Sequence, residues 1–177
     1  QAHAEYLEQM AGRFFDLLQK YHGLGERERL LLRLAAILHD CGKFISMSAP
    51  GECAYQIIMS TEILGISHME REMVASIVRY NTMELPNFSE FDGKLGNDEY
   101  LIVMKLAAIL RVCNALDRSH RQKFADMKLT IKDSNIVITT AYPDNITLEK
   151  KTLQDKQDFF EEVYGLGFEI KQKKKKQ

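Results

Sequence analysis

The segment ERERLLLRLAAILHDCGK, residues 26–43, decides the fold of this chain. Acidic residues stand in its first turn, where the positive end of a helix dipole favours them, and an apolar run follows from Leu30 to Leu38. Apolar side chains would cover most faces of such a helix. We therefore predict a helix over residues 26–45 that lies in the middle of a helical bundle.

Further helices are predicted on both sides of this segment. An apolar stripe at steps of three and four residues indicates a helix over residues 2–21, with its members at His3, Leu7, Met10, Phe14, Leu17 and Tyr21. Ser67 and Glu70 form the capping-box pattern that opens a helix ending near Asn81. Two more helices are expected over residues 54–64 and 98–116, with loops over residues 46–51 and 82–97.

The character of the sequence changes after Phe124. Apolar and polar residues alternate over Lys128–Lys132 and Ile136–Thr140, with a turn sequence between the two runs. Helical spacing returns over residues 149–164, and residues 167–171 have the pattern of a third strand. The predicted fold is therefore mainly α: a helical bundle over residues 1–124, then a small α+β unit (strand–strand–helix–strand) over 125–172, and a basic tail over 173–177.

Composition and charge exclude several classes of protein. The 177 residues carry a formal charge of −1, and removing the five lysines of the last seven residues leaves the remainder at −6. A nucleic-acid-binding domain would be basic. No apolar run is long enough to span a membrane. The three cysteines are odd in number and lack a C-x-x-C pair, which favours buried thiols in a reducing cytoplasm.

The dipeptide His39-Asp40 carries the chemistry of the predicted central helix. The two side chains can converge on one ion only where the helix frays and the chain turns, and we expect Gly42 to permit that turn. Imidazole and carboxylate groups are suitable ligands for a divalent ion such as Mn, Zn, Fe or Mg. A His-Asp pair alone is equally consistent with a polar cap at a helix end.

Two distant residues strengthen the metal hypothesis. His3 lies on the apolar face of the first predicted helix, and Asp117 ends the last apolar helix of the bundle. A buried carboxylate without a partner is costly, and a metal ion would satisfy all four groups together. The set His3, His39, Asp40 and Asp117 has the pattern of the HD superfamily, and the alternative is a core histidine with a backbone partner.

Several motifs resemble the C-terminal, HD-like domain of the exopolyphosphatase/guanosine pentaphosphate phosphohydrolase (Ppx/GppA) family. The resemblance covers nearly the whole chain and is carried by YHGLG (21–25), LHDCGKFIS (38–46), VRY (78–80), the segment 110–120 with its LDRS motif, and DFFEEVYG (158–165). It implies that this chain is an excised part of a longer protein. The missing N-terminal part would hold a pair of actin-like domains with the polyphosphate hydrolysis site.

The sequence departs from that family pattern at two positions. Glu52 and Asn81 stand where family members often have histidine. A second metal ion would need those imidazoles, so we expect one ion, or an empty site. Glu52 remains an alternative oxygen ligand beside the simpler interpretation of a solvated loop acid.

Three functions follow as hypotheses. In the first, the domain has an accessory role in the parent hydrolase, by binding polyphosphate, positioning the catalytic half or forming a homodimer. In the second, it is itself an HD phosphohydrolase for a nucleotide or other phosphate ester. An ion held by His3, His39, Asp40 and Asp117 acidifies a water, and Lys43 and Glu52 are the nearest candidates for a base. Lys43 and Arg118 would then contact phosphate oxygens, and the alternative is that both are ordinary solvated or ion-paired surface charges. In the third, it is a metal-free structural bundle.

Overall fold

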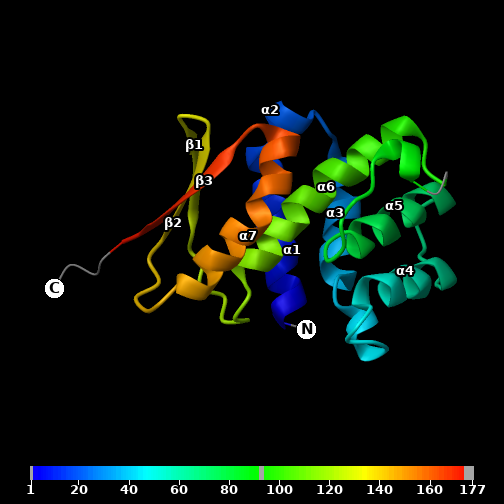
Figure 1. Cartoon of the computed structure of the whole chain (residues 1–177), viewed down its shortest axis with the longest axis horizontal. Helices are drawn as coiled ribbons and strands as arrows, with labels where there is room; N and C mark the ends of the chain where they lie inside the picture. The colour runs from blue at the N-terminus through cyan, green and yellow to red at the C-terminus, as the bar shows by residue number, and fades with distance from the viewer. Residues whose placement is uncertain (1, 92–93, 174–177) are drawn as a thin grey trace.

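The computed structural model describes residues 2–91 and 94–173 and shows a mainly helical chain with a three-stranded sheet at its C-terminal end. Helices α1, α6 and α7 lie side by side in the middle, α3, α4 and α5 pack on one side, and the strands lie on the other (Figure 1). The predicted fold class is confirmed. Residues 174–177 of the predicted basic tail lie outside the described residues.

The first two predicted helices are each divided in the structure. The segment predicted as one helix over residues 2–21 forms α1 (Ala2–Leu17) and the short α2 (Gln19–His22). Tyr21, the last member of the predicted apolar stripe, is 47% exposed. The helix predicted over 26–45 is α3 (Glu26–Leu38), followed by the 3-10 helix η1 (Cys41–Phe44). The α-helical hydrogen-bonding pattern therefore stops just before His39 and Asp40.

Helix α4 (Pro50–Ser60) begins four residues earlier than predicted, within the expected loop. Proline suits the first turn of a helix, where its missing N–H has no intrahelical partner. The early start also explains Gly42, because a Cβ at that position would collide with the carbonyl oxygen of Pro50. Gly42 is thus required for close approach of two backbones, and not for a left-handed turn.

The later helices agree closely with the prediction. The capping box of Ser67 and Glu70 opens α5 (His68–Arg79), and a long apolar helix, α6, spans Asn97–Leu116. A short 3-10 helix, η2 (Phe88–Glu90), interrupts the loop predicted between them.

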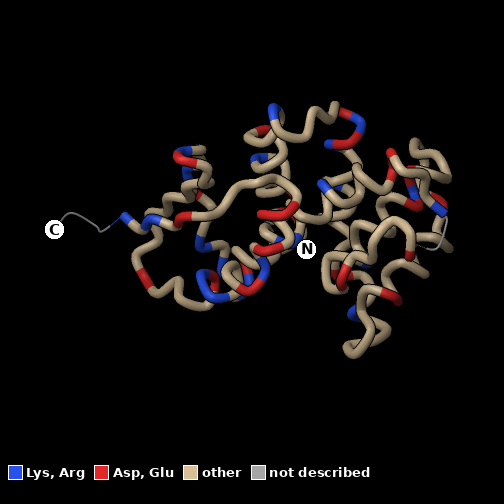
Figure 2. The backbone as a smooth tube through the Cα atoms, turned by 45° about the horizontal axis from the view of Figure 1, so that its top comes forward, with Lys and Arg blue, Asp and Glu red and all other residues tan. Residues whose placement is uncertain are grey.

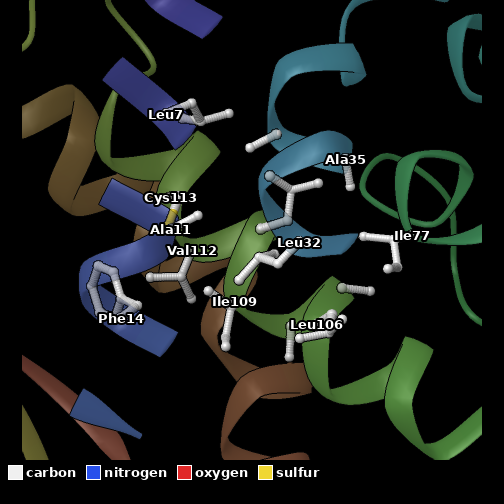
Figure 3. Close-up of a cluster of buried hydrophobic side chains, with 14 of the residues drawn as sticks. Leu7, Ala11, Phe14, Leu32, Ala35, Ile77, Leu106, Ile109, Val112 and Cys113 are labelled. Atoms are coloured by element: carbon white, nitrogen blue, oxygen red, sulfur yellow. The ribbon is translucent and has the colours of Figure 1, made fainter. Parts of the chain in front are cut away.

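Helix α6 occupies the centre of the hydrophobic core. It packs against α1, α3, α5 and α7, and Figure 3 shows its Leu106, Ile109 and Val112 among buried side chains of α1, α3 and α5. The prediction had placed residues 26–45 at the centre. Helix α3 does contact three helices, but it keeps an outer face on which Arg33 is exposed and Ile37 is 48% exposed.

The C-terminal unit has the predicted order of strand, strand, helix and strand. Strands β1 (Lys128–Lys132) and β2 (Asn135–Thr140) pair antiparallel, and β2 pairs in parallel with β3 (Gly167–Gln172) after the crossover helix α7 (Thr147–Tyr164). Leu153 and Phe160 of α7 belong to the same core cluster as the bundle. The domain boundary at residues 124/125 stays a prediction.

Charged residues and cysteines are spread over several elements of the fold. Figure 2 shows basic and acidic residues interspersed along the described part of the chain. All three cysteines are unpaired; Cys113 is buried, whereas Cys41 and Cys53 are only partly buried. Of the helices that the structure describes, none combines the length and the apolar character that crossing a membrane requires.

Candidate metal centre

His3, His39 and Asp40 come together at one end of the bundle. His3 lies in the first turn of α1, His39 directly follows α3, and Asp40 directly precedes η1. One ligand atom from each lies within 4.8 Å of the other two. The neighbours His39 and Asp40 can face the same point because the α-helix has already ended. Three of the four predicted ligands therefore converge.

The fourth predicted ligand, Asp117, lies on the far side of the His3 ring. Its Oδ2 is 2.6 Å from Nδ1 of His3, and its Oδ1 accepts a 2.8 Å hydrogen bond from the backbone N–H of Gln122. The carboxyl group is 1% exposed. An ionised carboxylate only accepts hydrogen bonds, so Nδ1 of His3 carries the proton and Nε2 is left with a lone pair. Direct ligation by Asp117 stays a prediction.

His39 is fixed in the same way by the backbone. Its Nδ1 is 2.6 Å from the carbonyl oxygen of Ala36, which also only accepts hydrogen bonds, and its ring is buried. Nε2 of His39 therefore also presents a lone pair, and it lies 3.2 Å from Nε2 of His3. Two lone pairs at this distance repel one another unless a proton or a cation lies between them.

The separation of the two Nε2 atoms suits a metal ion. Histidine nitrogens bind Zn²⁺ at about 2.0–2.1 Å, so two of them on one ion are roughly 3 Å apart. The observed 3.2 Å agrees with that value. The orientation of both rings, each held through Nδ1, is the arrangement that ligating histidines use. The residues present thus fit one divalent ion.

Asp40 supplies a carboxylate at the same point. Its Oδ1 lies 3.2 Å from Nε2 of His39 and 2.6 Å from Nζ of Lys43. Partial burial raises the pKa of Asp40, but the hydrogen bond and the positive charge of Lys43 oppose burial, and the pKa lies well below its usual range. Asp40 is therefore ionised at neutral pH, as a metal ligand must be.

The remaining predicted residues lie in other surroundings. Glu52 forms an ion pair with Arg79 at 2.8 Å and is not part of the converging group. Lys43 lies at the centre through its contact with Asp40. Arg118 lines a cavity between α6 and α7 whose lining includes neither histidine of the centre nor Asp40. The phosphate-binding role of Lys43 and Arg118 stays a prediction.

Sequence reasoning missed His120 as a neighbour of this centre. Its ring stacks on that of His3, with centroids 3.8 Å apart and planes 7° from parallel. Partial burial, and then the nearby His3, lower the pKa of His120. The stacking depends on a backbone φ of +55° in the turn after Asp117, and its only sequence signal is its position three residues beyond that carboxylate.

Comparison with known families gives one match. The model of the family described as Ppx/GppA phosphatase, domain III, matches residues 1–158, which extend from α1 through most of α7. No curated protein matches the chain. The family match confirms the resemblance found in the sequence, whereas the HD-type character of the site stays a prediction.

Proposed function

The chain belongs to the Ppx/GppA phosphatase family, as its domain III, and on that premise we propose that it is an accessory domain with one divalent-metal site. His3, His39 and Asp40 would hold the ion. The observation that carries this proposal is the 3.2 Å approach of the two Nε2 atoms, each left with a lone pair by the partner of its Nδ1.

The donor set favours some metals over others. Two imidazoles and one carboxylate suit Zn, Fe or Mn, whereas Mg prefers an all-oxygen environment. Such an ion, when bound, supplies Lewis acidity and acidifies a coordinated water. The ion would also join the start of α1 to the end of α3, and through Asp117 to the end of α6. It would therefore stabilise one end of the bundle.

An accessory role agrees with the surface next to the centre. Phe44, Ile45 and Met47 follow Lys43 and are 93%, 67% and 79% exposed, respectively. Burial of these side chains against another part of the parent protein, or against a second copy, would be favourable. The interspersed charges argue against a long polyphosphate track, which would need continuous positive potential (Figure 2).

Hydrolysis at this centre is the second candidate function. It is favoured by Lys43, whose ammonium group is 2.6 Å from Asp40 and would be near a phosphate group bound there. In this proposal His39 and Asp40 hold the ion and Lys43 contacts the phosphate of a nucleotide or of polyphosphate. Lys43→Met should then abolish turnover while metal binding is retained.

Metal content decides the proposal. The purified chain is stripped with a chelator, incubated separately with Zn, Mn, Fe(II) and Mg, and analysed for bound metal and thermal stability. We expect about one ion per chain and a raised melting temperature with Zn, Mn or Fe. The His39→Ala/Asp40→Ala double variant should lose both effects.

A matched control separates this result from nonspecific binding. His68→Ala/Asp126→Ala removes one exposed histidine and one exposed carboxylate elsewhere on the surface, and it should bind metal as the parent does. Absence of metal from the parent under all conditions would leave the metal-free structural module as the function of this domain.

A further inference from the structure

A second polar cavity, distinct from the metal centre, lies between α6 and α7 beside the end of α5. Its volume is about 390 Å³, and we call it the α6–α7 pocket. The lining residues that matter for its chemistry are Asn81, Asn114, Arg118, Thr152, Asp155 and Lys156. Nothing in the metal proposal assigns a role to this pocket.

Asn81 is the unusual residue of the pocket. It is only 5% exposed, and neither its amide nitrogen nor its amide oxygen has a hydrogen-bond partner among the residues that the structure describes. An unsatisfied buried polar group costs about 1–3 kcal/mol. Asn81 is also among the lining residues of the pocket, so a ligand there that offers both an acceptor and a donor would satisfy this amide.

The charges around Asn81 select an anion. Arg118 and Lys156 are exposed, and neither forms an ion pair with another residue in 2–91 or 94–173. Arg111 is a third, partly buried cation of the lining, and its Nε donates to the carbonyl oxygen of Tyr80 at 2.7 Å. Asp155 is the single carboxylate in the lining. Three cations against one acid, with an amide and hydroxyls, form a set of groups suited to phosphate.

The adjoining cavity limits the length of the ligand. That cavity of about 570 Å³ shares Arg111, Asp155 and Lys156 with the pocket, but Glu84, Asp158 and Glu162 also line it. Its carboxylates outnumber its cations by four to two, so a long polyanion that continued into it would be repelled. The pocket therefore suits one or two phosphate groups.

We propose that the α6–α7 pocket binds the phosphate group of a small anion such as inorganic phosphate or pyrophosphate. The Asn81 amide N–H donates to one phosphate oxygen, and its Oδ1 accepts from the P–OH of the monohydrogen form. Arg118 and Lys156 neutralise the charge. Sulfate has the same shape but no O–H at neutral pH, so it cannot satisfy Oδ1.

Calorimetric titration of the whole chain with phosphate, pyrophosphate, tripolyphosphate and sulfate tests this proposal. All titrations are made in the presence of a chelator, so that failure of the metal centre does not affect the result. We expect phosphate to bind at least fivefold more tightly than sulfate, because sulfate leaves Oδ1 unsatisfied. Pyrophosphate should bind more tightly than phosphate, and tripolyphosphate no more tightly than pyrophosphate.

Three variants identify the groups involved. Asn81→Asp keeps the shape but places a carboxylate against the anion, and it should abolish binding; Lys156→Met should weaken binding several-fold. Lys151→Met, on the same helix but outside the pocket lining, should bind as the parent does. Circular dichroism and melting curves confirm that each variant is folded. Equal binding of phosphate and sulfate, equal affinity in all variants, or no binding at 10-millimolar phosphate (roughly the weak limit of a specific site) would overturn the proposal.

Discussion

At the scale of single residues, the imidazole rings of His3 and His39 face each other, with their Nε2 atoms 3.2 Å apart. His3 and His39 are each oriented by a hydrogen-bond acceptor behind the ring, namely Asp117 and the carbonyl of Ala36. These acceptors determine which nitrogen holds the proton, and so determine that both lone pairs are directed to the same point. A metal ion, or one additional proton, relieves the repulsion.

Asp117→Asn tests the role of the acceptor behind His3. An amide cannot accept from both His3 and the Gln122 N–H through its two terminal atoms, so one buried donor loses its partner. We expect the free energy of unfolding of the metal-free protein to fall by about 1–3 kcal/mol, as measured by urea denaturation. Metal affinity should fall by about 10–100-fold.

The size of the loss of metal affinity separates two roles of Asp117. A residue that only orients His3 gives the stated range, whereas a direct ligand would give a larger loss. Asp126→Asn, at an exposed position, is the control and should change neither quantity. Unchanged metal affinity in Asp117→Asn would contradict both roles.

Helix ends set the geometry at the scale of elements. Helix α3 stops at Leu38, so His39 and Asp40 lie outside the α-helical pattern that would direct them apart. Helix α4 packs its first turn against Gly42, which keeps η1 close to the end of α3. The start of α5 is fixed by the Ser67–Glu70 capping box and by Arg27 of α3, which donates to Glu70 at 2.8 Å.

Glu70→Gln tests how the stability that the Arg27–Glu70 ion pair gives depends on pH. The hydrogen bonds from Arg27 and from the Ser67 backbone lower the pKa of Glu70 from 4.5 to about 2. Because the pKa of Glu70 is lower in the folded than in the unfolded protein, the ionised carboxylate stabilises the fold. This stabilisation is complete above the unfolded pKa, and it is lost as the pH falls through the folded pKa. The variant should therefore be less stable at pH 7, and the difference should shrink below about pH 4.5.

Melting temperatures from pH 3 to pH 7 measure this effect. Glu62→Gln replaces an exposed acid in the preceding turn and serves as the control, with no pH-dependent difference expected. A difference between Glu70→Gln and the parent that stayed constant down to pH 3 would show that the ionised carboxylate is not the stabilising form.

At the scale of the whole molecule, α6 and a buried ion pair connect the helical bundle to the C-terminal unit. Helix α6 contacts α1 and α3 on one side and α7 on the other, and Tyr164 of α7 donates a 2.8 Å hydrogen bond to the carbonyl oxygen of Lys105. Lys123, 9% exposed, donates to Glu149, which is fully buried, at 3.0 Å. This pair joins the segment after α6 to the first turn of α7.

Removal of one partner of the Lys123–Glu149 pair should lower the free energy of unfolding. Glu149→Leu leaves the ammonium group of Lys123 buried without its counter-charge, and we expect the free energy of unfolding to fall by about 3–5 kcal/mol. The double variant Lys123→Met/Glu149→Leu should recover part of that loss, because no unpaired charge remains. Urea unfolding of the parent, both single variants and the double variant forms a complete cycle. Additive losses in the double variant would contradict a coupled pair.

The sequence by itself determined the fold class, the order of strands and helices, and the α5 capping box, because these follow from local periodicity and short-range hydrogen bonds. It also singled out His3, His39 and Asp40, since an imidazole on an apolar face and a His-Asp pair at a helix end are local signals. Only the tertiary structure placed Asp117 behind His3 and His120 on its ring. It also placed α6 at the centre and left Asn81 without a partner, because each of these depends on which segments meet after packing.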